Sequence, residues 1–564
     1  MNLPDLIYSS RKKESRQISF GGLNHSESAA EGDLYDLRNL SSDSAPYLAP
    51  RARRYQVYAG NRIRTLTTLG NVLYFMQGTT LCRSSTIKQV QNGFSMDWMA
   101  KVEELTKISG LVNSMIVMGK RLILFPAMQV YDTEAEALHP IALSYNGGIS
   151  VSDGMLFGET AAENRLTLQD AWESLGFHVG DGVTITLTRD GEEDVSISAV
   201  IRAVDGTSAD FDEHCFAGMS GGYGGAVSRE APPLSYLLAC NNRLFGCGGN
   251  TVWASALGDP FNWYVYDGIS TDSWSVETED SGEFTGCCEF LGYPYFFKAD
   301  AIYKLYGSSA MEYQLTKTTA FGVKEGASNS LSAVGSTLFY LSPAGVCAYS
   351  GGYPTVILPP EQLGGYPSST SQAAATGSKY YLRLWLTEEA GANGLSDDIG
   401  LFVYDAQRKL WHKEDGAVAP SIESGYPGTR QRNLFGIAED GIWLIGTPAF
   451  SMSISEQGAQ IFGHRESAIS SFAEFGYSYH DTMNQKELHK LIVRLQVESG
   501  AKVKILASYD DGGYQILYET KSLTRQTLTI PIRPRRCDRY RLKIEGIGDY
   551  KIYAITKEYL VNQK

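Results

Sequence analysis

A short strand pattern recurs seven times along this chain of 564 residues, and it constrains the fold more than any other feature. Each copy opens at a turn or a polar residue and continues as an alternating run of apolar and aromatic residues. The copies start at Gly70, Gly119, Asn242, Gly292, Gly335, Gly377 and Arg432. Apart from one long interval they are about 42 to 56 residues apart, close to the ~40 to 50 residues of one four-stranded propeller blade. The repeat therefore predicts an all-β chain built around a β-propeller of six to eight blades.

The long interval, between Gly119 and Asn242, predicts a module inserted between two blades. Within it we expect a helix around residues 166–172, a strand-turn-strand over 177–187 and a further strand at 195–204. From about residue 462 the repeat gives way to longer strands of alternating apolar and charged residues, typical of an antiparallel β-sandwich. The predicted organisation is an N-terminal arm with the first propeller strands (1–60), propeller blades (61–141), an inserted small β-rich module (142–232), the remaining blades (233–460) and a C-terminal antiparallel β-sandwich (461–564).

Composition excludes several classes of function. The chain carries 63 acidic and 49 basic residues, a formal net charge of −14 that repels nucleic acid over most of the surface. DNA is therefore expected only as passing cargo. No apolar run approaches the ~18 residues of a membrane span, so no membrane insertion is expected. The eight cysteines lie scattered in mostly apolar strands without metal-ligand spacing, which favours buried structural thiols in a reducing compartment and no metal or cofactor.

Four groups of residues resemble parts of catalytic or metal sites, and each has a structural explanation that we favour. Residues 218–222 match GxSxG, but the glycine-rich stretch that follows predicts a flexible loop instead of the required helix. Residues 508–514 partly match a sialidase box, yet an Asp-Gly hairpin turn accounts for them. The acidic runs 190–194 and 210–214 lack the spacing of a calcium loop and are interpreted as solvated turns. His412, His480 and His489 lie singly in strand or loop contexts and are interpreted as surface or satisfied histidines. We therefore expect no catalytic, cofactor-binding or metal residues and no enzyme activity.

A dense group of aromatic residues follows the third repeat. Its members are Trp253, Trp263, Tyr264, Tyr266 and Trp274. Such rings could stack on the sugars of a host surface, but they also supply much of the energy of cores and subunit interfaces. We take these five residues as candidate core or interface aromatics.

Several phrases of the sequence resemble phage and prophage tail proteins built on a β-propeller. They are residues 20–24, 36–41, 241–246, 252–263, 281–286, 538–546 and 550–553. The similarity covers about residues 17–135 and 234–560. It implies a virion structural protein of a tailed bacteriophage, related to the nozzle or hub proteins of short-tailed phages. On this resemblance we expect a six-fold homo-oligomeric ring around the DNA exit channel, made in the host cytoplasm and contacting tail proteins such as an adaptor and fibres.

Two other functions stay open at this stage. A receptor-binding or glycan-degrading propeller of the tail would need paired carboxylates at a blade centre, which the sequence does not locate. A carbohydrate-binding propeller unrelated to phages is the other alternative. Fold alone is a weak guide among these, because one fold serves many functions.

Overall fold

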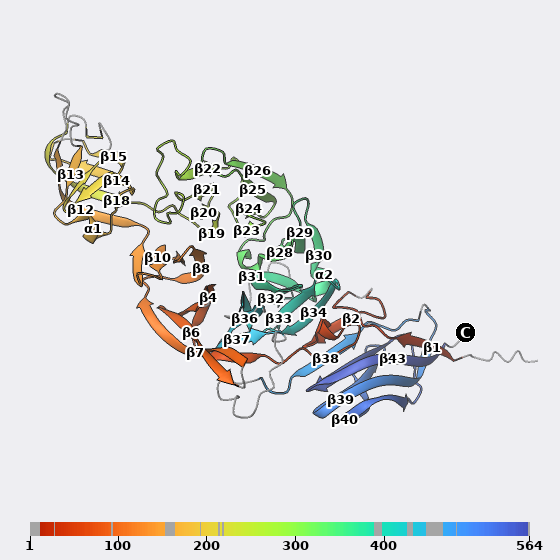
Figure 1. The fold of residues 1–564 in the computed structure, drawn as a ribbon. Coiled ribbons are helices and arrows are strands. Elements are labelled where there is room, and N and C mark those ends of the chain that lie inside the picture. Colours follow the sequence, from red (N-terminus) through yellow and green to blue (C-terminus); the bar gives the residue numbers. More distant parts are fainter. Residues whose placement is uncertain are drawn as a thin grey trace, which may run out of the picture. The chain divides into compact units, whose positions relative to one another are not determined.

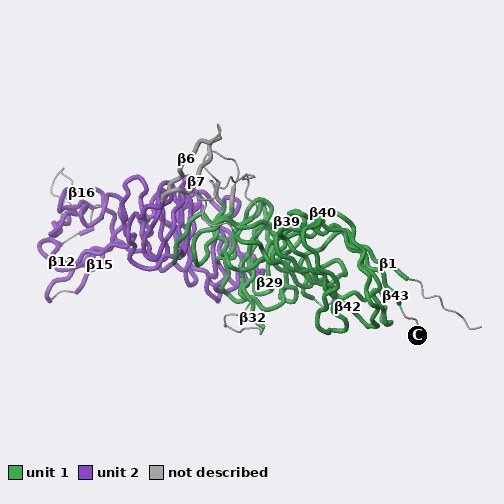
Figure 2. The backbone as a smooth tube through the Cα atoms, turned by 90° about the horizontal axis from the view of Figure 1, so that it is seen from below, with its two compact units in different colours: residues 1–61, 87–99, 329–564 green, residues 62–86, 100–328 purple. Residues whose placement is uncertain are grey.

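The computed structural model describes residues 12–26, 29–70, 72–91, 94–152, 164–191, 193–211, 215–216, 219–388, 398–425, 432–446, 466–480 and 482–561. Strands dominate these ranges (Figure 1), and the regular helices are the short α1 (Trp172–Leu175) and α2 (Pro360–Leu363). The chain divides into two compact units (Figure 2). Unit 1 comprises residues 1–61, 87–99 and 329–564, and unit 2 comprises residues 62–86 and 100–328. Within the described ranges, no helix is long and apolar enough to cross a membrane.

Seven four-stranded antiparallel sheets, counted over the described residues, make a seven-bladed β-propeller arrangement. Most of the strands of four blades lie in unit 2. They are β4 (Ile63–Leu69), β5 (Val72–Gln77), β6 (Thr80–Gln91) and β7 (Phe94–Lys107); β8 (Val112–Met118), β9 (Arg121–Pro126), β10 (Gln129–Asp132) and β11 (Ala137–Pro140); β19 (Tyr236–Cys240), β20 (Arg243–Gly248), β21 (Thr251–Ala254) and β22 (Trp274–Glu277); and β23 (Gly286–Phe290), β24 (Tyr293–Lys298), β25 (Ala301–Tyr306) and β26 (Gln314–Thr319).

The other three blades lie in unit 1. Their strands are β27 (Ser332–Val334), β28 (Thr337–Ser342), β29 (Gly345–Tyr349) and β30 (Thr355–Leu358); β31 (Tyr366–Thr376), β32 (Lys379–Thr387), β33 (Asp398–Asp405) and β34 (Leu410–Asp415); and β35 (Ala419–Gly425), β36 (Arg432–Ala438), β37 (Gly441–Ile445) and β3 (Tyr55–Ala59). The last blade takes its fourth strand, β3, from the N-terminal part of the chain, paired antiparallel with β37. Two distant parts of the sequence thereby close one sheet.

The seven sequence repeats correspond to the second strands of the seven blades. Each repeat leads into one of the strands β5, β9, β20, β24, β28, β32 and β36. These strands are rich in apolar residues because both their faces are covered. For example, β20 is buried at all six positions, and β28 is buried at every position after its first. The repeat pattern thus identified the propeller, and its expected range of six to eight blades contains the observed seven.

Neighbouring blades pack face to face within each unit. In unit 2 one core joins the β4–β7 and β8–β11 blades through residues such as Tyr74, Leu81 and Leu122. A second core joins the β19–β22 and β23–β26 blades through Phe245, Phe296 and their neighbours. In unit 1 the β31–β34 blade packs on the last blade. Each blade therefore depends on the next for burial of its apolar faces.

The inserted module is one seven-stranded sheet. Its order is β15-β14-β18-β12-β13-β17-β16. The strands are β12 (Leu143–Ser152), β13 (Arg165–Thr167), β14 (Gly182–Thr188), β15 (Val195–Val200), β16 (Ala203–Asp205), β17 (Ser208–Asp210) and β18 (Gly221–Arg229). A core that includes Trp172, Phe177 and Phe216 fills its interior.

Three local predictions in this module were wrong. The helix expected at 166–172 is strand β13 followed by a turn, and α1 begins only at Trp172, because Leu166 is fully buried in a ladder with β12 and β17. Residues 177–187 hold a turn and the single strand β14. The glycine-rich stretch after Ser220 is no loop: it opens β18, which pairs with both β12 and β14. At Gly225 a Cβ atom would lie 1.9 Å from the Thr186 carbonyl oxygen, so this close pairing requires glycine.

The C-terminal β-sandwich belongs to unit 1 and recruits strands from the N-terminal arm. Its sheet runs β1-β43-β39-β42-β38-β2, with β40 and β41 also paired to β39. The strands are β1 (Lys13–Gln17), β2 (Leu34–Arg38), β38 (Ser470–Phe475), β39 (Lys486–Tyr509), β40 (Gln515–Pro531), β41 (Arg536–Cys537), β42 (Tyr540–Ile547) and β43 (Tyr550–Val561). Among the described residues of the predicted arm at 1–60, β3 enters the propeller, whereas β1 and β2 complete the sandwich.

Candidate functional site: two charged junctions and an exposed loop

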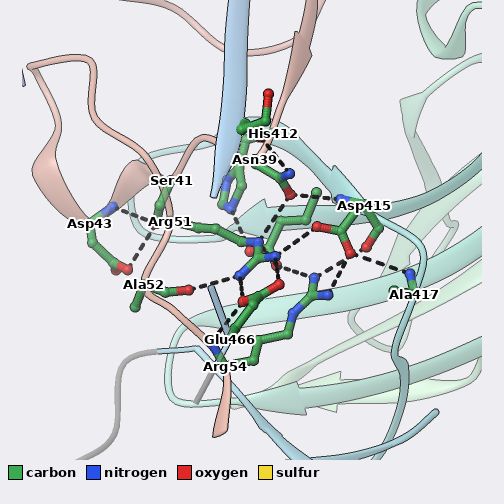
Figure 3. A network of polar contacts seen from close by, with 12 residues as sticks. Asn39, Ser41, Asp43, Arg51, Ala52, Arg54, His412, Asp415, Ala417 and Glu466 are labelled. Atoms are coloured by element: carbon green, nitrogen blue, oxygen red, sulfur yellow. Dashed lines mark hydrogen bonds and ion pairs between the residues drawn. The ribbon is translucent and has the colours of Figure 1, made fainter. Parts of the chain in front are cut away.

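In unit 1 the sandwich meets the propeller through a buried cluster of charged side chains (Figure 3). Arg51 makes a bidentate pair with Glu466, with both Nη–Oε distances at 2.7 Å, and its Nη2 also donates to Asp415 at 2.7 Å. Arg54 donates to Asp415 Oδ1 at 2.6 Å and to Glu414 Oε2 at 2.8 Å. Both arginines precede β3. Glu414 and Asp415 end the blade strand β34, and Glu466 leads into the sandwich strand β38. One cluster thus fixes three separate segments.

The side chain of Asn39 links the two bodies directly. Its Oδ1 accepts from Arg51 Nε at 3.0 Å and from the Asp415 amide at 2.9 Å, while its Nδ2 donates to the Ser470 carbonyl at 2.9 Å. Asn39 follows β2 and has a positive φ of 57°, a conformation that asparagine tolerates better than most residues. A single amide therefore bonds a propeller strand and a sandwich strand at once.

The electrostatics of this cluster keep the carboxylates of Glu414 and Asp415 ionised. Burial alone would raise the pKa of Glu414, but His412, Arg54 and Arg51 together lower it to about 2. The pKa of Asp415 is likewise held well below its ordinary value, against burial, by the two arginines. Three carboxylates face two guanidinium groups, and the His412 imidazole lies on the carboxylate side with Nε2 3.8 Å from Glu414 Oε1. Because both guanidinium groups are hydrogen-bonded to carboxylates, the cluster compensates its buried charges while it fixes orientation.

A second charged junction, in unit 2, joins the inserted module to the blades. Arg229 at the end of β18 donates from Nη1 to Asp181 Oδ2 at 2.5 Å, and both side chains are almost fully buried. The same guanidinium donates to the carbonyls of Ile141 and Pro140, where β11 ends. Asn262, in the β21–β22 loop, donates to Asp181 Oδ1 at 3.0 Å, and its Oδ1 accepts from the Gly182 amide at 2.9 Å. The module is therefore bonded to two blades instead of hanging from a flexible linker.

The five candidate aromatics separate into buried and exposed members. Trp263 is 1% exposed and packs between the β8–β11 and β19–β22 blades, with Trp253 half-buried against the same core. Trp274 packs at the opposite face of the blade, edge-on to Tyr313 at 5.5 Å. Tyr264 and Tyr266 remain exposed, at 38% and 56%, on the β21–β22 loop beside the module. Of the set, only these two tyrosines are placed to meet a partner.

The catalytic-looking motifs are not assembled into a nucleophile site among the described residues. Ser220 is followed by strand β18, whereas a nucleophile elbow needs a helix after the serine. Residues 508–514 form the β39–β40 hairpin as expected, although its left-handed positions are Asp510 and Asp511 and not an Asp-Gly pair. In both motifs the local backbone serves strand connection.

The acidic runs and the histidines have structural surroundings. Arg165 Nε lies 2.6 Å from Asp210 Oδ1 in an ion pair. Residues 212–214 of that acidic run lie outside the described residues. His480 stacks on the ring of Tyr559 with centroids 3.5 Å apart. Over the ranges that are described, no group of three or more His, Cys, Asp or Glu is placed to hold a metal ion. The eight cysteines are free thiols, five of them buried.

One surface cavity of about 400 Å³ lies in unit 1 beside β31. It is lined by His25, Pro360, Glu361, Gly364, Gly365, Tyr366 and Glu388. The side chain of Tyr366 is 45% exposed, and His25 Nδ1 is bonded to the carbonyl of Tyr35 at 3.0 Å. The pocket thus offers two carboxylates and one aromatic ring, a combination that suits sugar hydroxyls.

Sequence reasoning missed the residues of both junctions. Arg51, Arg54 and Glu466 come together only in the folded chain, more than 400 residues apart in sequence. The single local signal was the arginine pair that precedes β3, since charged residues at a strand entry need partners if they are buried.

No protein-family model matches the chain, and no curated protein matches it. Among solved structures, the WD40 domain of Neurospora crassa Pan2 is similar at 8% identity and a TM-score of 0.31, over 70% of this chain and 92% of that one. An exo-β-1,3-galactanase from Phanerochaete chrysosporium, solved with galactose, is similar at 10% identity and a TM-score of 0.22, over 57% of this chain and 94% of that one. Likenesses at these identities concern the fold alone.

Proposed function

We propose that this chain is a structural protein of a bacteriophage tail, a nozzle or hub component that assembles as a homo-oligomeric ring around the DNA exit channel. Its partners are other tail proteins such as an adaptor and fibres, DNA is only passing cargo, and the chain carries out no catalysis. It acts in the virion after synthesis in the host cytoplasm. The phage-like phrases of the sequence motivate the identity, and the charged junctions support the mechanical part of the proposal.

One observation carries the proposal: each appended module is joined to propeller blades by a buried, hydrogen-bonded charge network. Such a network has one low-energy arrangement, because any displacement leaves charges buried without partners, at a cost of several kcal/mol (~3–5). Apolar contacts alone tolerate sliding more readily. A chain that serves by shape gains from junctions that hold its modules in one orientation.

The direct test is to locate the chain in a particle. Virions of the source phage, labelled with an antibody to this chain, are imaged by electron microscopy. We expect label at the distal tail, in a ring around its axis, with no label on the capsid. Label confined to the capsid, or virions that contain none of the chain, would refute the proposal.

The cavity beside β31 favours a second candidate function, a receptor-binding or glycan-degrading tail protein. Glu361 and Glu388 lie in one pocket with the exposed ring of Tyr366. Paired carboxylates are the acid and base of most glycosidases, and an aromatic ring is a common platform for a sugar.

Release of reducing ends from purified host polysaccharide distinguishes the two candidates. The enzyme reading requires release by the unmodified chain and its loss in Glu361→Gln or Glu388→Gln. A matched control is Glu325→Gln, which changes an exposed glutamate in the connection between β26 and β27. Absence of release by the unmodified chain removes the enzymatic candidate. Binding of the polysaccharide without release favours receptor binding if Tyr366→Ala abolishes it and the two glutamine variants keep it.

A further inference from the structure

Six large apolar side chains stand exposed at one end of two neighbouring blades in unit 2. This set, the tyrosine face, consists of Leu257, Ile269, Leu291, Tyr293, Tyr306 and Met311, exposed between 38% and 71%. Leu257 and Ile269 lie on the loop after β21. Leu291 and Tyr293 lie at the turn between β23 and β24, and Tyr306 and Met311 lie at the end of β25 and on the loop after it. In an antiparallel sheet those connections share one edge. A soluble surface seldom gathers so many large apolar groups without a partner.

Hydrogen bonds join the four connections of the tyrosine face into one surface. Gly258 donates to the Asn242 carbonyl at 2.8 Å, and Asn241 donates from its side chain to the Gly292 carbonyl at 3.3 Å. Ala310 donates to the Ser270 carbonyl at 3.5 Å, which links the third-strand loops of the two blades. The rings of Tyr293 and Tyr306 have centroids 5.5 Å apart and share Lys304. The face is therefore continuous across two blades.

The charge beside the tyrosine face is acidic. Glu289 and Glu312 are exposed there, and each accepts a hydrogen bond from a neutral donor on its own loop. Within the described ranges neither carboxylate forms an ion pair, and the cation on the face itself, Lys304, lies over the rings of Tyr293 and Tyr306. A partner that covers this face must therefore bring apolar groups together with cations.

The sandwich of the same chain has such a surface. This arginine end consists of Tyr479, Met483, Arg533 and Arg535, all exposed, with Met483 at 93%. Lys486 holds the two loops together by donating to the carbonyls of Thr482 and Asp538. Over the part of the chain that the structure describes, neither arginine forms an ion pair, and the Arg535 guanidinium lies over the Tyr509 ring, 5.7 Å from its centroid.

We propose that the tyrosine face of one copy binds the arginine end of the next copy. The inference rests on the proposed ring and identifies its contact surfaces. Apolar groups meet at the centre, and Glu289 and Glu312 meet the guanidinium groups of Arg533 and Arg535 at the rim. Because the two surfaces differ, the contact is heterologous, the type that closes into rings or continues into filaments. The overall charge of −14 makes this basic surface a rare complement for the acidic face.

Complementary surface variants test the contact on the full-length chain by sedimentation velocity. Met311→Asp removes one surface and Arg535→Glu the other, and both side chains are exposed, so folding is checked by circular dichroism and expected to be unchanged. Met311→Asp alone is expected to weaken self-association about 30-fold, the effect of a central interface residue. Arg535→Glu should have a comparable effect, because it sets a carboxylate against the acidic rim of the next copy. Mixed in equal amounts, the two variants retain one good pair of surfaces and are expected to stop at dimers.

The control is Tyr353→Asp, which changes a 79% exposed tyrosine on another blade and should assemble like the unmodified chain. Unmodified chain that stays monomeric, variants that assemble normally, or a mixture that stays monomeric would each overturn the contact. So would loss of polysaccharide binding in Met311→Asp with unchanged self-association, since the face would then bind a glycan. None of these results depends on antibody labelling of virions, which decides the proposed function separately.

Discussion

Replacement of Glu414 by glutamine measures how much the unit 1 junction contributes to stability. The pKa of this buried carboxyl is lowered from an ordinary value of 4.5 to about 2, against burial, by His412, Arg54 and Arg51. The free energy that corresponds to this difference is about 3 kcal/mol at pH 7. Because the folded-state pKa lies below the unfolded one, this stabilisation is complete above about pH 5 and is lost as the pH falls toward 2.

The expected stability difference therefore depends on pH. Glu414→Gln should unfold about 3 kcal/mol more easily than the unmodified chain at pH 7, and only about 1 kcal/mol more easily at pH 3. Urea denaturation followed by tryptophan fluorescence measures both values, and Trp411 lies three residues away on the same strand. Other carboxylates titrate in both proteins, so the comparison isolates this one.

The matched control for this measurement is Glu325→Gln, at an exposed glutamate, which should change stability by less than about 0.5 kcal/mol. An equal loss of stability at pH 7 and pH 3 in Glu414→Gln would refute the reasoning. In that case the carboxyl would act by packing and not through its charge.

Three further substitutions probe unit 2. Arg229→Met leaves a buried carboxylate unpaired and should cost about 3–5 kcal/mol, seen as faster proteolytic release of the inserted module; unchanged proteolysis would contradict a charged junction. Trp263→Ala should cost about 3–5 kcal/mol in thermal or urea unfolding, while Tyr266→Ala stays within about 0.5 kcal/mol; equal effects would contradict their different burial. Gly225→Val should unfold the module, measured by circular dichroism, while Gly222→Ala has open space for its methyl group and should fold; a folded Val variant would contradict the close strand pairing.

The sequence identified the propeller because its signal is local. Strands such as β20 and β28 are buried on both faces, so each reads as a run of apolar residues after a turn, and seven such runs at regular spacing indicate blades. The helix expected at 166–172 failed for a related reason. A short apolar run such as the one containing Leu166 has no period of its own, and pairing with two strands decided its structure.

The junctions and the tyrosine face were beyond sequence reasoning because they depend on contacts between distant segments. No local pattern around Arg51 predicts its contact with Glu466, and none around Asp181 predicts its contact with Asn262. The candidate aromatics show the same limit. The sequence showed that the aromatic residues are close together along the chain. It did not show which rings are buried, like Trp263, and which are exposed, like Tyr266, because that depends on the path of the β21–β22 loop in the folded protein.

The charged junctions allow stability and orientation to be separated. Removing both charges of the unit 2 junction, as in Arg229→Met with Asp181→Leu, leaves no unpaired carboxylate. Replacement of a buried ion pair by apolar side chains is often neutral or stabilising by ~1–4 kcal/mol. The double variant should therefore unfold no more easily than the unmodified chain.

If the junction serves orientation, this double variant should still hold its module less firmly, because methionine and leucine contacts tolerate sliding. Spin labels at two exposed positions of unit 2, Asp205 on the module and Lys120 on a blade turn, report the distribution of distances between them by pulsed electron paramagnetic resonance. We expect a wider distribution in the double variant at unchanged stability. Equal distributions would mean that the apolar surroundings of Asn262 fix the module by themselves, and the charges would then need an explanation other than stiffness.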